Sequence, residues 1–349
     1  MSPALNRSPH RPRLRRLIDW LSPVQPQPDD IDPEDAIHRQ VKAIEVRART
    51  HLREQFVGEF RSAFRGRGLE FSDIRAYLPG DDVRFIDWNV TARRGDPYIK
   101  QFVEEREQTV FLLLDVSASV SFGTVGRSVQ NYATEVAGLL GFAAALNNDR
   151  VGAAAFDTEL IYTLPPRKGR RHVLRLLHDL LALQRSDRTE HPKTTAGTDL
   201  PQAIEYASRL LRRGSVVFII SDFLDDKLDD RRDEAVDATA TDNSGASAWE
   251  VPLRRLAMQH DVVALVVHDP HEAAIPAGGL IRLQDSESGQ TRTVEADLAG
   301  QRLAKASQER LATLPQRLRA ANVDFALLPT DEPYLRKLLS LFRARTRRQ

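Results

Sequence analysis

The chain has 349 residues, 41% of them hydrophobic, which is enough to bury a sizeable core and too apolar for a disordered chain. Its 50 basic and 49 acidic residues nearly balance, which argues against a general nucleic-acid binder, so we expect no specific nucleic-acid partner. It has no cysteine, which excludes disulfides, thiolate metal sites and cysteine nucleophiles and fits a reducing cytosol.

The chain before residue 110 divides into a tail and a mixed region. Residues 1–34 are rich in proline and arginine and predict a flexible tail without the apolar segment of a secretory signal. The segment 34–65 has apolar residues at helical spacing, whereas glycines and prolines punctuate 66–109. We therefore predict, over 35–109, an N-terminal helix followed by a β-rich elaboration of short strands and turns.

From residue 110 onward, apolar strand-like runs alternate with longer helix-like stretches. The strand-like runs are 110–115, 151–156, 160–164, 215–221, 261–268 and 322–328. The helix-like stretches are about 125–147, 169–185, 200–213, 250–260, 296–321 and 332–345. This alternation predicts an α/β fold over 110–330, with a doubly wound, mostly parallel sheet flanked by helices. We expect the acidic segment 225–249 to be a flexible insertion and 331–349 to be a C-terminal helix with a basic tail.

Oxygen-bearing side chains follow the first predicted strand of the sheet. Asp115, Ser117 and Ser119 come directly after the apolar run 110–114, which is typical of a strand buried on both faces. Because open α/β sheets bind ligands beyond the carboxyl ends of their strands, these side chains stand where a ligand is expected. Three hard oxygen donors suit Mg²⁺ or Ca²⁺ better than zinc.

Two further segments fit the same site. The strand-like run 215–221 leads directly to Asp222, and Thr198 precedes a predicted helix. If the strands 110–115 and 215–221 are neighbours, Asp115 and Asp222 approach each other at one sheet edge, and Thr198 adds a hydroxyl from a third side. The alternative for any one of these residues is a helix cap or a turn, so only their combination favours a metal site.

With these residues in place, the chain resembles the von Willebrand factor A domains over about residues 108–330. Their metal-ion-dependent adhesion site combines the motif Asp-x-Ser-x-Ser with a threonine from a second loop and an aspartate from a third. The resemblance implies the metal ligands Asp115, Ser117, Ser119, Thr198 and Asp222. It also implies a bound Mg²⁺, or Ca²⁺ or Mn²⁺ in its place.

A second resemblance involves the mixed region before the predicted sheet. Its motifs are Gly68–Asp82, Arg84–Asn89, Thr91–Arg93, Tyr98–Phe102 and Glu104–Glu105, with Asp269–Glu272 later in the chain. They are similar to the signature of the bacterial family called domain of unknown function 58, whose members join it to a von Willebrand A-like domain. The chain resembles the short, soluble type of this family. The family is commonly linked with MoxR-type AAA+ ATPases, so the resemblance implies such an ATPase and a client protein as partners.

Arginines and carboxylates alternate in this region, and two roles are open for them. Arg75 and Arg84, with acidic neighbours such as Asp81, could form ion pairs that hold the elaboration onto the sheet, with Trp88 and Tyr77 adding apolar area. Alternatively, these arginines and aromatic residues form a face where a partner docks. We favour the structural role, because a turn-rich elaboration needs ties to the core.

Two histidines are candidate catalytic bases, and both have a simpler interpretation. His178 lies on a predicted helix and His268 ends a predicted strand, where a hydrogen-bonded structural histidine is more common. The sequence has no Ser-His-Asp spacing motif, no Gly-rich phosphate loop and no dinucleotide fingerprint. We therefore expect that the protein is not an enzyme.

The expected function is a metal-dependent protein-interaction or adaptor module that assists a MoxR-type ATPase in the assembly or maturation of a client protein. Two alternatives stay open: a metal-assisted hydrolase that uses Asp115 or Asp222, and a scaffold whose metal site is purely structural. No apolar run approaches the ~20 residues of a membrane helix, so we expect a cytoplasmic protein with no integral membrane segment.

Overall fold

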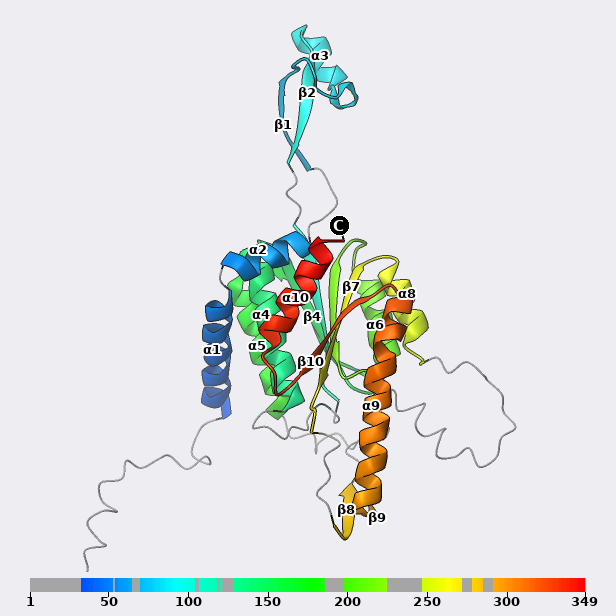
Figure 1. Ribbon diagram of the computed structural model, residues 1–349. Helices are drawn as coiled ribbons and strands as arrows, with labels where there is room; N and C mark the ends of the chain where they lie inside the picture. The colour runs from blue at the N-terminus through cyan, green and yellow to red at the C-terminus, as the bar shows by residue number, and fades with distance from the viewer. Residues whose placement is uncertain are drawn as a thin grey trace, which may run out of the picture.

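A central mixed sheet organises the fold (Figure 1). The computed structural model describes residues 33–52, 54–64, 70–103, 107–117, 120, 128–185, 198–224, 247–271, 278–284 and 291–348. The predicted tail up to residue 32 and the insertion residues 225–246 lie outside these ranges. The six strands of the sheet have the order β10-β7-β6-β3-β4-β5, and all neighbours run parallel except the β4–β5 pair.

The strands match the predicted ones closely, and they confirm the α/β class with a doubly wound, mostly parallel sheet. They are β3 (Thr109–Asp115), β4 (Arg150–Phe156), β5 (Leu160–Lys168), β6 (Val216–Ser221), β7 (Asp261–His268) and β10 (Asp324–Pro329). In β3, Leu112 and Leu114 face one hydrophobic core while Phe111 and Leu113 face the other. Burial on both faces explains why β3 has an unbroken apolar sequence.

Helices cover both faces of the sheet. The first core contains residues of α4 (Val129–Leu146), α5 (Arg170–Arg185) and α10 (Tyr334–Thr346). The second contains residues of α6 (Leu200–Leu210), α8 (Glu250–Ala257) and α9 (Ala296–Ala320). Among the described residues, no helix combines the length and the apolar character needed to cross a bilayer.

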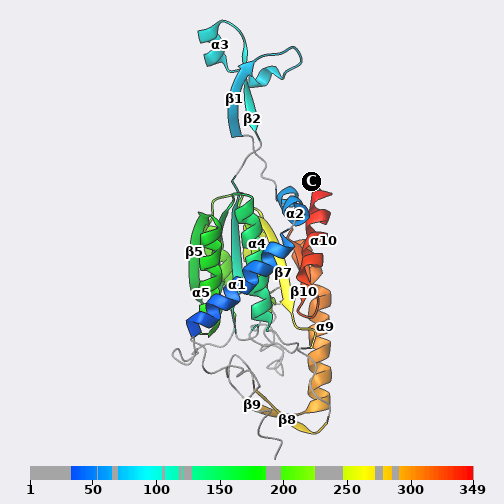
Figure 2. The same ribbon diagram turned by 90° about the vertical axis from the view of Figure 1, so that its left-hand side faces the viewer.

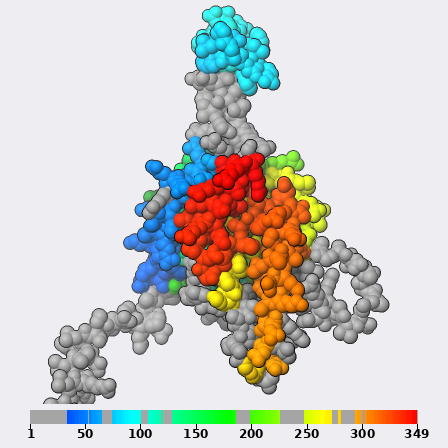
Figure 3. Space-filling view, in the orientation of Figure 1, coloured from blue at the N-terminus to red at the C-terminus, as the bar shows by residue number. Residues whose placement is uncertain are grey.

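The helix α10 belongs to the same core as the sheet. Leu338 and Phe342 are fully buried, and Figure 3 shows α10 lying alongside α2 (Glu54–Ala63) on one face of the molecule. Arg345 has a side chain only 6% exposed and donates to Asp324 and to Asp261, both at 2.6 Å. This guanidinium therefore fastens the end of α10 to the starts of β10 and β7.

The single helix predicted over 34–65 is wrong, because the structure has two helices there. The first, α1 (Pro33–His51), packs across α4 and α5 as an outer layer, as Figure 2 shows. The second is α2, which starts at Glu54 and turns its buried Phe56 and Phe60 toward α10. The two helices pack on different neighbours, so the chain must bend between them.

The elaboration is a small hairpin unit that Figure 1 shows beyond the sheet, at the end where β3 begins. Its antiparallel strands are β1 (Glu70–Ala76) and β2 (Tyr98–Val103), joined through η3 (Val83–Phe85) and α3 (Trp88–Arg94). The sequence did not predict the helix α3, which Asp87 caps by accepting from the backbone N–H of Asn89 and Val90. A second unpredicted hairpin, β8 (Leu280–Gln284) with β9 (Thr291–Glu295), precedes α9.

Candidate metal centre

Asp115 ends β3 at the carboxyl edge of the sheet, between two parallel neighbours. Its carboxylate is buried, and Ser117, also buried, donates its backbone N–H to Asp115 Oδ1 at 3.0 Å. The register pairs Asp115 with Phe156 on β4 and Leu114 with Ile220 on β6. The predicted neighbour relation of these strands is therefore correct, and Asp115 faces the last residue of β6.

Ser221 is that last residue, and it is not among the predicted ligands. Its hydroxyl donates to Asp115 Oδ2 at 2.7 Å and accepts the backbone N–H of Phe223 at 2.9 Å. Ser221 thus orients the Asp115 carboxylate and occupies one of its hydrogen-bond acceptor positions. The strand register is the signal that identifies this role, because it sets Ser221 one step beyond the Leu114–Ile220 pair.

Asp222 follows immediately, at a sharp bend of the chain. Phe223 has a φ of 56°, in the left-handed region that favours glycine, and Asp222 is only 5% exposed. The carboxylate of Asp222 accepts the backbone N–H of Leu224 at 3.0 Å, while Arg310 of α9 donates to the Asp222 carbonyl at 2.9 Å. The bend is therefore held from both sides.

The two carboxylates interact electrostatically. Burial, and then the negative charge of Asp222, raise the pKa of Asp115 from its usual 3.8 to about 7. Two buried acids of like charge are unfavourable unless a proton or a cation neutralises them. This donor set, carboxylates with adjacent hydroxyls, fits a hard divalent cation such as Mg²⁺ or Ca²⁺.

Thr198 lies just before α6, with its hydroxyl oxygen buried. The next residue, Asp199, caps α6 by accepting the backbone N–H of Gln202 at 2.9 Å. The backbone N–H of Asp199 donates at 2.8 Å to the carbonyl of Asp157, directly after β4. Thr198 therefore belongs to the same carboxyl edge as Asp115, and the neighbouring Asp199, not Thr198, caps the helix. Ser119 lies outside the described residues.

The histidines considered as bases do not join the centre as a catalytic pair. His268 ends β7 at the same edge, and burial, followed by the charge of Arg310, lowers its pKa, so the ring is neutral at neutral pH. The neighbouring Asp269 accepts the backbone N–H of His271 at 2.8 Å, which closes a turn. His178 lies on α5, where its ring contacts Asp179 of the same helix.

The charged residues of the elaboration pair with each other. Arg75 makes a two-pronged contact with Asp81, both bonds at 2.7 Å, and Arg84 pairs with Asp82 at 2.6 Å. Each of these pairs lies within the elaboration, so the expectation that they tie it to the sheet is wrong. Trp88, expected to add apolar area to such a contact, is 68% exposed.

A family model described as "Protein of unknown function DUF58" matches residues 73–312. The chain belongs to the DUF58 family. An uncharacterized protein of Mycobacterium tuberculosis (strain ATCC 25618 / H37Rv) is 30% identical over 321 residues, which cover 91% of this chain and 92% of the relative. An uncharacterized protein of Mycobacterium bovis matches to the same extent. The family match includes most of the elaboration and the carboxyl edge with Asp115 and Asp222.

Solved structures similar to this DUF58 protein have low sequence identity and low TM-scores. The conserved hypothetical protein BatB from Bacteroides thetaiotaomicron has 15% identity and a TM-score of 0.39, covering 69% of this chain and 99% of that one. The VWA domain of SpRpn10 has 10% identity and a TM-score of 0.32, covering 68% of this chain and 95% of that domain. These likenesses concern the fold alone.

Proposed function

We propose that this DUF58 protein is a metal-dependent protein-interaction module that acts through the carboxyl edge of its sheet. The observation that carries the proposal is the approach of two buried carboxylates, Asp115 and Asp222, beside the hydroxyl-bearing Ser117. Thr198 and Ser119 complete the proposed ligand set. The cation supplies positive charge that attracts a carboxylate, and this chain's residues hold it with one position left for that oxygen.

The proposed occupant is Mg²⁺, with Ca²⁺ or Mn²⁺ as substitutes, because all of the ligands are oxygen atoms. Ser221 supports the choice, since its hydroxyl donates to one oxygen of Asp115 and so orients that carboxylate. An aspartate or glutamate from a partner would complete the shell. Such a contact has strong electrostatic attraction and sets few geometric demands on the partner.

The proposed partner is a MoxR-type AAA+ ATPase, with a client protein whose assembly or maturation the pair assists. Membership of the DUF58 family supports this choice. We place the interaction in the cytoplasm, where the absence of cysteine carries no cost for stability.

The elaboration offers a second surface for the same function. Four large hydrophobic side chains are exposed there within a short stretch: Leu78, Val83, Phe85 and Trp88. Arg75 and Arg84 pair with acids of the same unit and leave these apolar side chains exposed beside them, although the Arg84 side chain is itself 83% exposed. This arrangement favours the docking role over the structural one for this segment.

The decisive experiment measures Mg²⁺ binding by calorimetry and then complex formation with a MoxR-type ATPase from the same source. We expect Asp115→Ala to fold normally and to lose both. The matched control is Asp149→Asn, because Asp149 is also buried but lies just before β4, at the opposite end of the sheet. The control should retain both activities, and unchanged partner affinity in Asp115→Ala would refute the proposal.

The same binding experiment, together with a substrate screen, separates the two alternative functions. If the metal site is purely structural, the wild type binds Mg²⁺, and its affinity for the ATPase is the same with and without Mg²⁺. A metal-assisted hydrolase predicts Mg²⁺-dependent turnover in a substrate screen, removed by Asp115→Asn. We propose that the protein is not an enzyme, and metal-dependent turnover lost in that variant would overturn this.

A further inference from the structure

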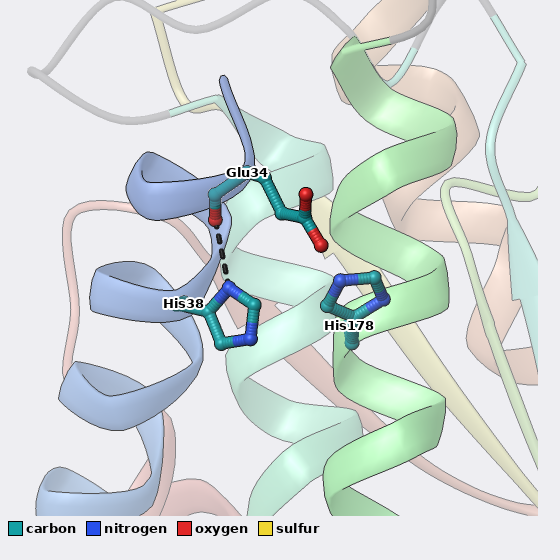
Figure 4. Close-up of side chains that lie close together, drawn as sticks. All are labelled: Glu34, His38 and His178. Carbon is teal, nitrogen blue, oxygen red and sulfur yellow. Dashed lines mark hydrogen bonds between the residues drawn. The ribbon is translucent and has the colours of Figure 1, made fainter. Parts of the chain in front are cut away.

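Three potential metal ligands meet on the opposite side of the body from α9, between α1 and α5. Glu34 and His38 come from the first turns of α1, and His178 comes from the middle of α5. One nitrogen of each ring and one carboxylate oxygen of Glu34 lie within 4.8 Å of one another. Figure 4 shows the three side chains converging in the space between the two helices.

The packing of α1 fixes this meeting point. Glu34 and His38 are four residues apart, so they share one face of the helix. Gly138 on α4 allows the close approach, because a Cβ there would lie 2.9 Å from Ile44 of α1 and 3.1 Å from Leu177 of α5. Farther along, Arg170 of α5 pairs with Glu45 of α1 at 2.5 Å, which sets the register of the two helices.

His38 is oriented as a metal-ligating histidine would be. Its Nδ1 lies 2.9 Å from the backbone carbonyl of Glu34, and since a carbonyl can only accept, Nδ1 carries the proton. The neutral ring then has its lone pair on Nε2. A backbone carbonyl that holds the other ring N–H is a common outer partner of histidine ligands.

His178 has an outer partner of the second common kind, a carboxylate. Its Nδ1 lies 3.4 Å from Asp179 Oδ1, a long contact that directs the proton to this side of the ring. Asp179 is itself anchored, because Tyr162 on β5 donates its hydroxyl to Asp179 Oδ2 at 2.7 Å. The lone pair of His178 Nε2 then points toward Glu34 and His38, where it can bind a metal.

We propose that Glu34, His38 and His178 form a second metal site, selective for Zn²⁺ or a similar transition metal, with water in the remaining position. Two imidazole nitrogens and one carboxylate oxygen are a ligand set that suits zinc and leaves a fourth position open. Mg²⁺ prefers oxygen ligands and is discriminated against here.

The present spacing needs only a small adjustment to hold zinc. Tetrahedral coordination at about 2.0–2.1 Å sets ligand atoms ~3.3 Å apart, so the side chains must close by roughly 1–1.5 Å. Glu34 and His38 are exposed, and His178 has a side chain 38% exposed, so each can change rotamer without disturbing the core. Bound zinc would join the start of α1 to α5, and it would stabilise the folded state through mass action.

The test is a calorimetric titration of the full chain with zinc chloride. Excess Mg²⁺ is present, so that the oxygen-lined site at the sheet edge is already occupied by Mg²⁺ if it binds a metal ion. We expect one saturable zinc site. His38→Gln and His178→Gln should each weaken zinc binding by at least about 100-fold, since even the loss of an outer partner costs roughly 10–100-fold. Asp179→Asn, which removes only an outer partner, should weaken it by about 10-fold.

The matched control is His172→Gln, a second histidine of α5 whose ring contacts the carbonyl of Pro165 at 3.1 Å instead of this cluster. It should bind zinc as the wild type does. Zinc should also raise the melting temperature of the wild type and the control but not of His38→Gln. Equal zinc affinity in all of these proteins, or the absence of a saturable site in the wild type, would overturn the proposal. Neither result bears on Mg²⁺ binding by Asp115.

Discussion

Replacing Asp115 with asparagine should change stability in opposite directions with and without metal. In the metal-free protein, burial and the Asp222 charge raise the pKa of Asp115 from 3.8 to about 7. The difference, 7 − 3.8, is about 3 units, and at ~1.4 kcal/mol per unit the buried anion costs up to about 4 kcal/mol. Because the folded-state pKa is raised, this protonation stabilises the protein fully below about pH 4, and that contribution is lost as the pH rises through about 7.

The expected result follows from these magnitudes. In EDTA at pH 8, Asp115→Asn should be more stable than the wild type by ~2–3 kcal/mol, after about 1 kcal/mol is deducted for a poorer hydrogen bond to Ser221. At pH 5 the advantage should become small. In Mg²⁺ at 100 times its Kd, the wild type alone should gain ~2.7 kcal/mol, which cancels or reverses the order.

Urea denaturation followed by circular dichroism measures these differences at pH 5 and pH 8, each with EDTA or Mg²⁺. An equal loss of stability in Asp115→Asn under all four conditions would refute this expectation. That result would mean that the Asp115 side chain stabilises the fold through its shape and hydrogen bonds, and that repulsion between Asp115 and Asp222 does not favour cation binding.

Three more predictions concern other parts of the molecule. Arg345→Met should cost ~2–3 kcal/mol in thermal or urea unfolding, because it removes the charge-assisted hydrogen bonds to Asp261 and Asp324, whose carboxylates are partly exposed. Arg348→Met, at an ion pair whose arginine is 72% exposed, should cost less than about 1 kcal/mol, and equal costs would contradict this. Trp88→Ala should change the stability by no more than ~0.5 kcal/mol, since the side chain is 68% exposed. It should weaken ATPase binding about 10-fold in a pull-down or calorimetric assay. Unchanged affinity would contradict the docking role of the elaboration. Asp149→Asn should stabilise the protein at pH 7, because burial raises the pKa of Asp149 to about 6. The free energy of unfolding of this variant should depend less on pH between about pH 4 and 6. An equal loss of stability at pH 4 and pH 7 would argue against this.

The sheet could be predicted from the sequence because its four inner strands, β3, β4, β6 and β7, are buried on both faces. A run such as Val110–Leu114 has little alternative to that environment, and the residue after it must then reach the carboxyl edge. Asp115 and Asp222 were predictable for this reason, since the register of β3 and β6 brings both strand ends to one place.

Other features depend on tertiary contacts that a single sequence does not encode locally. The hydrogen bond from Ser221 to Asp115 requires the strand register, and the meeting of His38 with His178 requires α1 to lie across α5. Apolar spacing continues from α1 into α2, so the break between them could not be seen from periodicity. The helix α3 is only seven residues long and depends on its Asp87 cap, which the turn signals around it obscure.

The elaboration enters the fold at the start of β3, and Asp115 stands at the end of the same strand. Seven residues of extended chain separate the two ends by about 20 Å. A molecule built this way can act as a tether. Under the proposed function, in which the ATPase contacts both the elaboration and the metal edge, each contact would raise the effective concentration of the ATPase at the other, so two modest affinities would suffice for a durable complex.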